Sequence, residues 1–342
     1  MSSEYYCKTQ VIPLIESHPR PLWSVMIPTY NCSSYLYEVL KSVLDQDLGS
    51  EAMQIEVIDD CSNLDDPAKV VEQLARNRVE FFRQPQNQGH IENFNTCLTR
   101  SRGELIHLLH GDDFVAPNFY TKMQQLFEAN PALGAAFCRY TYVGEDGQPS
   151  FGLSELEQEH SGVLNDWLCK ITSNQRIQPP SMVVRREVYE ALGGFDRRIC
   201  CCGEDWEMWI RIASHYTVGY EPEPLAFYRM QTKSLTGKCS RSGQNIRDIV
   251  QIMEIISEYL PKNQKHQLLR QAKRDRWEYY LYTFIPNCLE QGDFEAVINQ
   301  LKEIPKLNLS LKSIWKILKI LLELSIKKSL MLISKSERGG CT

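Results

Sequence analysis

Residues 103–113, GELIHLLHGDD, place a short apolar run directly before two adjacent aspartates. The run at 105–109 is brief and almost wholly apolar, which is typical of a strand buried on both faces. Asp112 and Asp113 follow where that strand would end. Their carboxylates suit a hard divalent cation, but aspartates are equally common in solvated turns and at helix N-caps. Taken alone, the pair favours neither interpretation.

Strand and helix signals alternate on both sides of this stretch. Apolar runs predict further strands at 23–27, 55–58, 79–83 and 135–143. Between them, apolar residues at helical spacing predict helices over 33–44, 67–77, 90–101 and 117–127. Strands separated by helices predict an α/β fold with a mainly parallel central sheet, covered on both faces.

Polar residues interrupt the sequence where the predicted strands end. Ligands of such sheets bind outside the carboxyl ends of the strands. Three clusters are expected to meet at one edge and form a binding site: Tyr30 and Asn31, Asp59 and Asp60, and Asp112 and Asp113.

The pattern becomes helical after residue 244, which divides the chain. We expect an N-terminal extension (1–21), a catalytic domain (22–243), a helical appendage (244–304) and a basic amphipathic C-terminal helix and tail (305–342). No apolar segment with a small-residue cleavage site precedes residue 21, so we expect a cytoplasmic protein. Its twelve cysteines form no C-x-x-C pair, and we expect reduced thiols that fill a core.

Charge is distributed unevenly along the chain. Residues 305–342 carry eight basic and two acidic side chains, which gives +6, and the net charge of −5 leaves −11 for the remainder. An acidic body argues against binding to nucleic acid. In the C-terminal helix, lysine recurs every three or four residues among apolar side chains, too often for a membrane span. Residues 306–335 either lie on an anionic membrane surface or pack against the catalytic domain or a partner.

The ordered set of motifs resembles family 2 glycosyltransferases. It comprises 24–31 (SVMIPTYN), 57–62 (VIDDCS), 87–89 (NQG) with Asn95, 103–113 with Pro117, 180–196 (PSMVVRREVYEALGGFD), 203–211 (GEDWEMWIR) and 228–234 (YRMQTKS). The resemblance covers roughly residues 22–236. It implies the glycosyltransferase-A fold and an inverting transfer of a sugar from a nucleotide sugar, with a UDP-sugar favoured. The acceptor is expected to be a glycan or a lipid-linked molecule.

The resemblance also implies roles for individual residues. The nucleotide site would comprise Pro28, Tyr30, Asn31, Asp60, Asn95, Asp112 and Arg229. Within it, Asp60 would accept a hydrogen bond from the base, and Arg229 would meet the diphosphate. Asp113, with Asp112, would bind Mg²⁺ or Mn²⁺. Asp205 would be the general base, and the adjacent Glu204 is expected to raise its pKa by like-charge repulsion.

Two positions depart from the family pattern. His110 stands where relatives often have aspartate, and Gln231 replaces the histidine of the Y-R-x-H-x-x-S motif. A catalytically inactive nucleotide-sugar-binding or scaffold protein is therefore the alternative function. A nucleotidyltransferase would need a glycine-rich basic loop near the first strand, which SVMIPTYN lacks, and no G-x-G-x-x-G indicates a dinucleotide enzyme.

Two tryptophans accompany the expected general base. Trp206 fits either stacking on an acceptor sugar or a core position, and Trp209 is expected in the core. If the membrane interpretation of the C-terminal helix holds, the enzyme would be peripheral on the inner face of the membrane.

Overall fold

The computed structural model describes residues 12–13, 20–75, 77–231, 235–307 and 311–338. The chain forms two compact units. The first comprises Met1–Ile171, Gln175–Ile199 and Glu204–Thr232, and the second comprises Thr172–Asn174, Cys200–Gly203 and Lys233–Thr342. Most of the N-terminal extension, residues 232–234 of the last motif and the tail after residue 338 lie outside the described residues.

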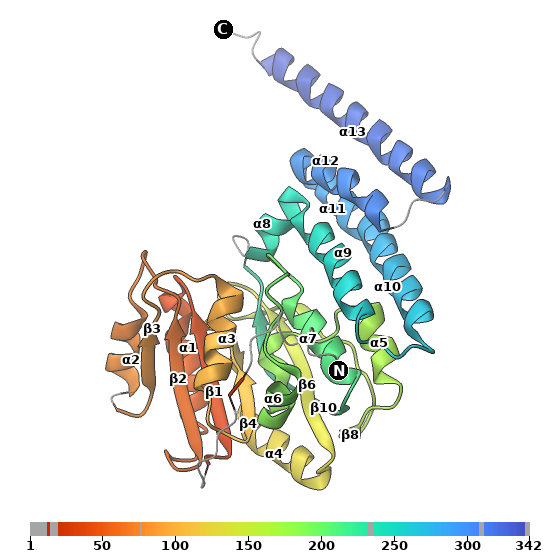
Figure 1. Ribbon diagram of the computed structural model, residues 1–342. Coiled ribbons are helices and arrows are strands. Elements are labelled where there is room, and N and C mark those ends of the chain that lie inside the picture. Colours follow the sequence, from red (N-terminus) through yellow and green to blue (C-terminus); the bar gives the residue numbers. More distant parts are fainter. Residues whose placement is uncertain (1–11, 14–19, 76, 232–234, 308–310, 339–342) are drawn as a thin grey trace. The chain divides into compact units, whose positions relative to one another are not determined.

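One mixed sheet forms the centre of the first unit (Figure 1). Its strands are β1 (Trp23–Thr29), β2 (Met53–Asp59), β3 (Glu80–Arg83), β4 (Leu105–Leu108), β5 (Phe114–Val115), β6 (Leu133–Val143), β7 (Pro149–Leu153), β8 (Gly162–Val163), β9 (Met182–Arg185) and β10 (Thr217–Arg229). Their order is β3-β2-β1-β4-β9-β6-β10-β5, with β7 beside β6 and β8 beside β10.

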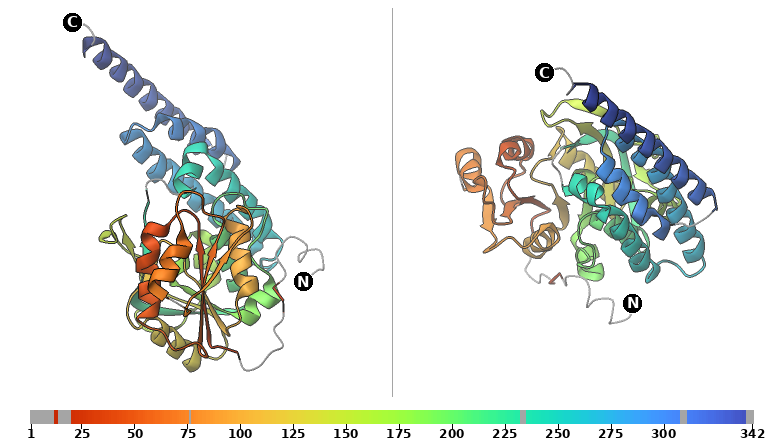
Figure 2. Two further views of the ribbon diagram at one scale, coloured as in Figure 1. Left: turned by 90° about the vertical axis from the view of Figure 1, so that its left-hand side faces the viewer. Right: turned by 90° about the horizontal axis from the view of Figure 1, so that it is seen from above.

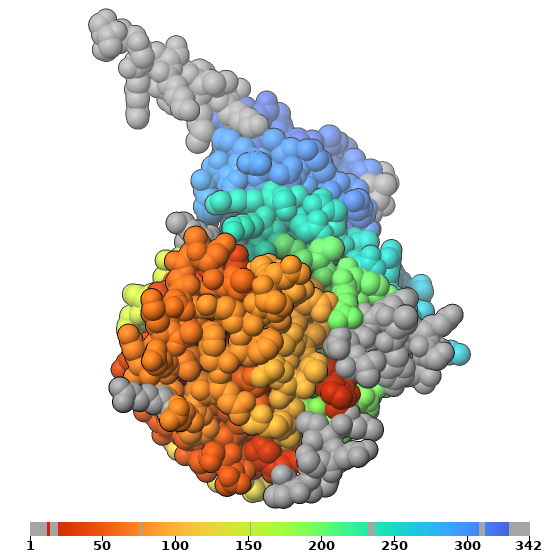
Figure 3. Space-filling model, turned by 60° about the vertical axis from the view of Figure 1, so that its left-hand side comes forward, coloured from red at the N-terminus to blue at the C-terminus, as the bar shows by residue number. Residues whose placement is uncertain are grey.

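The helices around this sheet follow the predicted alternation. They are α1 (Ser33–Leu44), α2 (Pro67–Ala75), α3 (His90–Arg100), α4 (Phe119–Ala129), α5 (Trp167–Ser173), α6 (Arg186–Leu192) and α7 (Glu204–Ala213), with a 3₁₀ turn at Pro179–Ser181. Figure 2 shows α1 and α2 on one face of the strands and α3 on the other. In Figure 3, the segment that contains α1, α2 and α3 forms a continuous orange surface on the first unit. The predicted α/β fold, with helices on both faces of a central sheet, is thus confirmed.

Strand β1 lies in the interior of the sheet, between β2 and β4. Every one of its residues is buried, and it pairs in parallel with β2 on one side and β4 on the other. Because a strand in this position must be apolar on both faces, the run WSVMI identifies it without alternation. Parallel pairing places the carboxyl ends of β2, β1 and β4 at the same edge.

The second half of the sheet holds strands that the sequence analysis did not predict: β5, β7, β8, β9 and β10. Strand β9 lies antiparallel between β4 and β6, whereas β6 and β10 are parallel. Within a longer motif, residues 182–184 form an apolar run of only three residues, too short for a pattern to separate strand from helix. The fourth predicted helix also begins two residues late, after Asn118 adopts a left-handed conformation with φ of 70°.

The second unit is helical. It contains α8 (Leu235–Ser242), α9 (Gln244–Ser257), α10 (Lys265–Tyr279), a π-helical turn (Tyr280–Phe284), α11 (Ile285–Glu290), α12 (Phe294–Glu303), a 3₁₀ turn (Ile304–Lys306) and α13 (Leu311–Arg338). Among the helices described, none is long and apolar enough to cross a membrane.

The prediction of reduced cysteines is wrong for one pair. Cys201 and Cys239 form a disulfide in the second unit, with Cα atoms 6.4 Å apart. Segment 200–203 lies beside α8 although 38 residues separate the two cysteines, a proximity that cysteine spacing cannot reveal. Cys97 and Cys138 are buried thiols, as expected.

Gly103 is required by the close pairing of β1 and β4. A Cβ there would collide with the backbone of Trp23 and Ser24, while its N–H donates to Ser24 Oγ at 2.7 Å. We expect Gly103→Ala to lower the free energy of unfolding by about 1–3 kcal/mol, the usual cost of overpacking. Urea-induced unfolding measures this, with the exposed Glu104→Ala as control. Equal stability of the two variants would contradict this account.

Candidate functional site

The three predicted polar clusters meet at one edge of the sheet. The order β2-β1-β4 places the loops after these strands next to one another. The Asp60 N–H donates to Thr29 O at 2.9 Å, and the Gly111 N–H donates to Pro28 O at 3.0 Å. Pro28 is a buried residue of β1, so its carbonyl connects the acidic loop (residues 109–113, between β4 and β5) to the central strand. Tyr30, the next residue but one, is 45% exposed.

Asn31 joins the loops after β1 and β2. It is left-handed, with φ of 51°, and its carbonyl Oδ1 accepts the N–H groups of Asn63 and Leu64 at 2.9 and 3.0 Å. Its Nδ2 donates to Asn63 Oδ1 at 3.1 Å. The structure therefore places Asn31 at the predicted edge, with its amide bonded to the neighbouring loop.

The two aspartates after β2 have different surroundings. Asp59 is fully buried and paired with Arg83, whose Nε lies 2.6 Å from Oδ2. Asp60 accepts the N–H groups of Gln88 and Gly89 at 2.7 and 2.9 Å, just before α3 begins. Burial raises the pKa of Asp60 although these two donors oppose the shift. Asp59 is thus a structural ion pair, and Asp60 fixes the entry to α3.

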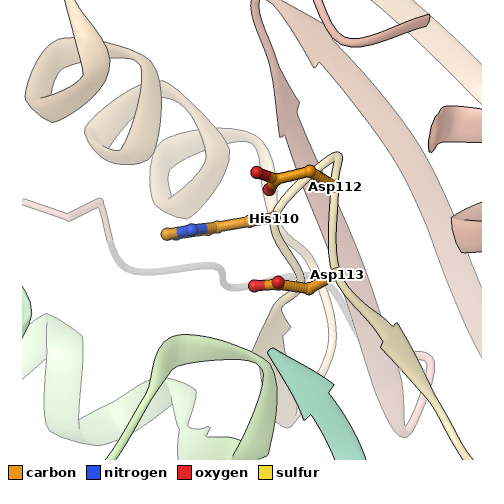
Figure 4. Close-up of side chains that lie close together, drawn as sticks. All are labelled: His110, Asp112 and Asp113. Carbon is orange, nitrogen blue, oxygen red and sulfur yellow. The ribbon is translucent and has the colours of Figure 1, made fainter. Parts of the chain in front are cut away.

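His110, Asp112 and Asp113 form one cluster on the loop between β4 and β5. One potential ligand atom of each lies within 4.8 Å of the others, and Figure 4 shows the three side chains extending in the same direction. His110 Nε2 and Asp113 Oδ2 are buried and have no hydrogen-bond partner among the described residues. Such orphaned atoms are costly unless a ligand pairs with them.

Burial sets the protonation of this cluster. It lowers the pKa of His110 to about 4, so the imidazole is neutral near pH 7 and retains a lone pair. It also raises the pKa of both carboxyls, and for Asp113 the charge of Asp112 adds to the shift. A divalent cation would reverse this cost by pairing with both carboxylates. The residues therefore fit a divalent metal.

Arg229 clamps the acidic loop from behind. Its Nε donates to Asp112 O at 2.7 Å, and its backbone N–H donates to Asp113 Oδ1 at 2.8 Å. The guanidinium also bonds to the carbonyls of Gly144 and Glu145 at 3.1 and 3.0 Å and pairs with the Glu38 carboxylate. The side chain is only 1% exposed. These bonds use four of its five N–H groups, so Arg229 holds the acidic loop in place, and its contact with the diphosphate stays a prediction.

Gln231 occupies the position where the family pattern has histidine. Its Nε2 donates to Asp112 Oδ2. An amide N–H cannot coordinate a cation, so this residue orients Asp112. One carboxylate oxygen of Asp112 therefore already accepts a hydrogen bond.

Glu204 and Asp205 begin α7. Gln175 Nε2 donates to Asp205 Oδ2 at 2.7 Å, and His90 Nε2 lies 3.6 Å from Glu204 Oε1. Burial, followed by the charge of Glu204, raises the pKa of Asp205 to about 8. The like-charge effect expected from adjacency has the predicted sign. Burial also opposes ionisation of Glu204, but His90 and other favourable contacts hold its pKa below the usual value.

A tyrosine cluster lies near both acidic groups, and the motif analysis missed its β6 members. Tyr140 and Tyr142 alternate on β6, with their hydroxyls 3.3 Å apart, and the ring of Tyr142 lies edge-on to Tyr228 at 6.0 Å. Burial, then the charges of Asp113, Asp112 and Asp205, raises the pKa of Tyr228. The sequence signal was the period-two spacing of Tyr140 and Tyr142, together with the position of Tyr228 beside Arg229.

Two other residues singled out by the sequence, Asn95 and Trp206, are buried in the protein interior. Asn95 is buried, and its amide exchanges hydrogen bonds with the backbone of Phe195 at 2.8 and 3.2 Å. These bonds hold Asn95 against the Phe195 backbone, and its nucleotide contact stays a prediction. Trp206 is also buried, and its Nε1 donates to Ile171 O at 2.6 Å. Trp209 is buried as expected.

Comparisons with known proteins agree with this architecture. The family described as glycosyl transferase family 2 matches residues 24–193, about half of the chain. An uncharacterised Mycobacterium tuberculosis protein, MT1568, is 29% identical over 244 residues, covering 68% of this chain and 75% of its own.

Two solved structures share the fold at 16% identity. The structure of S. aureus TarS 1–349 in complex with UDP-GlcNAc has a TM-score of 0.62, covering 83% of this chain and 81% of that one. The mannosyltransferase PcManGT of Pyrobaculum calidifontis, in complex with GDP-Man and Mn²⁺, has a TM-score of 0.55, covering 95% and 93%. The fold and the segment that the family model matches identify the chain as a glycosyltransferase. The chain belongs to glycosyltransferase family 2.

The Arg229 clamp makes a testable prediction about the acidic loop. We expect Arg229→Leu to lower the free energy of unfolding by about 1–3 kcal/mol, because carbonyls lose their donor. It should also weaken Mn²⁺ binding, measured by electron paramagnetic resonance of the free ion, because the loop is no longer fixed. Arg197→Leu is the control, since it removes an exposed pair with Glu92. Unchanged Mn²⁺ affinity in Arg229→Leu would refute the positioning role.

Proposed function

We propose that the protein is an inverting, metal-assisted glycosyltransferase that moves a sugar from a nucleoside-diphosphate donor, with a UDP-sugar favoured, to an acceptor hydroxyl. One observation carries the proposal. The ligand atoms His110 Nε2 and Asp113 Oδ2 are unpaired among the described residues, and after burial the charges of Asp113, Asp112 and Asp205 raise the pKa of Tyr228, so a candidate cation site and a candidate base lie near the same side chain. The reacting carbon of a donor sugar would lie between these two groups.

Asp112 and Asp113 would hold Mg²⁺ or Mn²⁺, with His110 as a further ligand. A bound cation would neutralise the charge that builds on the departing diphosphate. The neutral imidazole favours Mn²⁺, because Mg²⁺ prefers an all-oxygen octahedron. The Mn²⁺ complex of the structurally similar mannosyltransferase supports this preference. Asn31 and Arg229 would then act by holding the surrounding loops.

The nucleotide would lie just beyond the carboxyl end of β1. Tyr30 offers an accessible ring for the base, and Pro28 precedes it in the strand. Asp60 already accepts two backbone N–H groups, but each carboxylate oxygen can accept a second bond, so contact with a base N–H remains compatible. The UDP-GlcNAc complex of TarS supports a UDP-sugar.

Asp205 would be the general base, with Glu204 tuning its pKa. Its carboxylate takes the proton of the acceptor hydroxyl, and the oxygen attacks the anomeric carbon from the face opposite the nucleoside diphosphate. The C–O bond to the leaving phosphate breaks and the configuration inverts. A positioned base contributes on the order of 10²–10⁴ in rate.

The acceptor would be a glycan or a lipid-linked molecule. The name of one matched relative, the putative teichuronic acid biosynthesis glycosyltransferase of Bacillus subtilis, supports a surface polymer. A lipid-linked acceptor would place the enzyme on the cytoplasmic face of a membrane, in contact through residues 306–335.

Metal-dependent nucleotide binding is the first test. UDP at 100 times its dissociation constant should stabilise the protein by about 2.7 kcal/mol. We expect a thermal shift with UDP and Mn²⁺, a smaller one with Mg²⁺ and none in EDTA. Asp113→Asn should abolish the shift, whereas the exposed Asp45→Asn should retain it. If no nucleoside diphosphate shifts the wild type, the catalytically inactive alternative replaces this proposal.

The pH dependence of the reaction tests the base. Because the pKa of Asp205 lies at about 8, kcat/KM should rise tenfold per pH unit below 8 and level off above it. Glu204→Gln removes a neighbouring negative charge, which lowers the pKa of Asp205 and moves the plateau to lower pH. The control is Glu92→Gln, whose exposed carboxylate pairs with Arg197. An unmoved profile in Glu204→Gln would remove its tuning role.

A further inference from the structure

Helix α13 has one side fixed within the helical unit. Ser313, Ile320 and Leu324 are buried, and they recur along one stripe of the helix. Next to this stripe, Lys327 Nζ donates to Leu289 O of α11 at 3.2 Å. Lys316 Nζ lies 4.8 Å from the ring centre of Tyr282. These contacts set the rotation of α13 about its axis and so determine which side faces away.

The opposite side of α13 is apolar. Six large side chains there are 40–74% exposed: Ile314, Trp315, Leu318, Leu321, Leu322 and Ile326. At 100° per residue they share one half of the helix circumference, centred opposite the buried stripe. We call this surface the outer face. Contiguous exposed apolar surface of this kind marks an interaction site rather than a solvated face.

Lysines border the outer face. Among the side chains described on α13, Lys312, Lys316, Lys319 and Lys327 stand against one acidic residue, Glu323, which gives +3. Lys312 and Lys319 are themselves exposed, beside the apolar residues. The sequence outside 305–342 carries −11, so an anionic surface would repel the rest of the chain and attract this helix.

The apolar outer face and the lysines beside it together indicate what kind of partner α13 binds. A second copy packed outer face to outer face would bring two sets of lysines together, which opposes association. An apolar face bordered by lysine, with an exposed tryptophan, is suited to a membrane interface, where the apolar residues enter the acyl boundary and cations remain at the phosphates. No helix among those described could cross the bilayer, so α13 would lie in its plane.

We propose that the outer face of α13 docks on the surface of an anionic phospholipid membrane. The apolar side chains insert below the headgroups, and Lys312 and Lys319 contact their phosphates. Its purpose rests on the proposed function, because a lipid-linked acceptor is reached at such a surface. The docking itself does not depend on catalysis.

Vesicle flotation of the full-length protein tests the docking. We expect it to float with vesicles containing phosphatidylglycerol, weakly with pure phosphatidylcholine, and less as salt is raised. The double variant Leu318→Gln/Leu322→Gln should lower partitioning at least tenfold. Both leucines are exposed, so the fold should persist. Leu64→Gln is the matched control, because Leu64 is a more exposed leucine on the first unit, and it should float as the wild type does.

Two further measurements separate charge from insertion. Lys312→Gln/Lys319→Gln should reduce binding and flatten its salt dependence. Trp315 fluorescence should shift to the blue on vesicle addition, and Trp315→Phe should lose that shift. Wild-type protein that fails to float, or variants that float equally, would overturn the proposal. Self-association of the wild type that Leu318→Gln/Leu322→Gln abolishes, without lipid binding, would assign the outer face to a second copy instead.

Donor hydrolysis without membranes distinguishes the two proposals. If the α13 variants hydrolyse the donor at the wild-type rate while losing flotation, docking and catalysis are separate and both stand. If the protein floats as expected but no donor is turned over, the proposed transferase function fails and the docking remains.

Discussion

The hydrogen bonds of Arg229 hold together the part of the molecule on which the site depends. One guanidinium at the end of β10 joins the acidic loop, the turn after β6 and a carboxylate of α1. The buried Asp113 lies beside the half-buried Asp112 at that loop, which is electrostatically costly. The Arg229 cation lies behind them and reduces the cost without filling the side on which the ligand atoms of His110 and Asp113 remain unpaired. The same arrangement keeps these atoms oriented for a ligand.

The acidic residues at this edge differ by what they already bind. Asp59 is neutralised by Arg83, and Asp60 accepts two backbone N–H groups and retains capacity for further bonds, so both hold loops. Asp113 retains one unpaired oxygen, and Asp205 has a neighbouring carboxylate that favours its protonated form. A carboxylate with unsatisfied bonding capacity can act on a ligand, whereas a saturated one mainly positions its surroundings. Burial alone would not separate these cases.

Much of the first unit was predictable because parallel strands buried on both faces leave simple patterns. The runs at β1, β2 and β4 predicted the edge where the site forms, and the like-charge effect of Glu204 on Asp205 followed from adjacency. The sequence could not show a side chain's partner where that partner is remote in the chain. Asn95 bonds to Phe195, 100 residues away, and Arg229 bonds to the loop that it was expected to face across a diphosphate. Cys201 pairs with Cys239 for the same reason.

By itself the sequence determined the fold class, the family and the residue types gathered at the strand ends, because periodicity and local motif order record which segments must be buried. Only the tertiary structure decided which of those residues are free to act. It showed that the clamp uses four N–H groups of Arg229, that His110 joins the acidic pair, and that the apolar side of α13 faces outward. Many hydrogen bonds join segments that are distant in the chain, so only the folded structure shows which donors and acceptors remain unpaired.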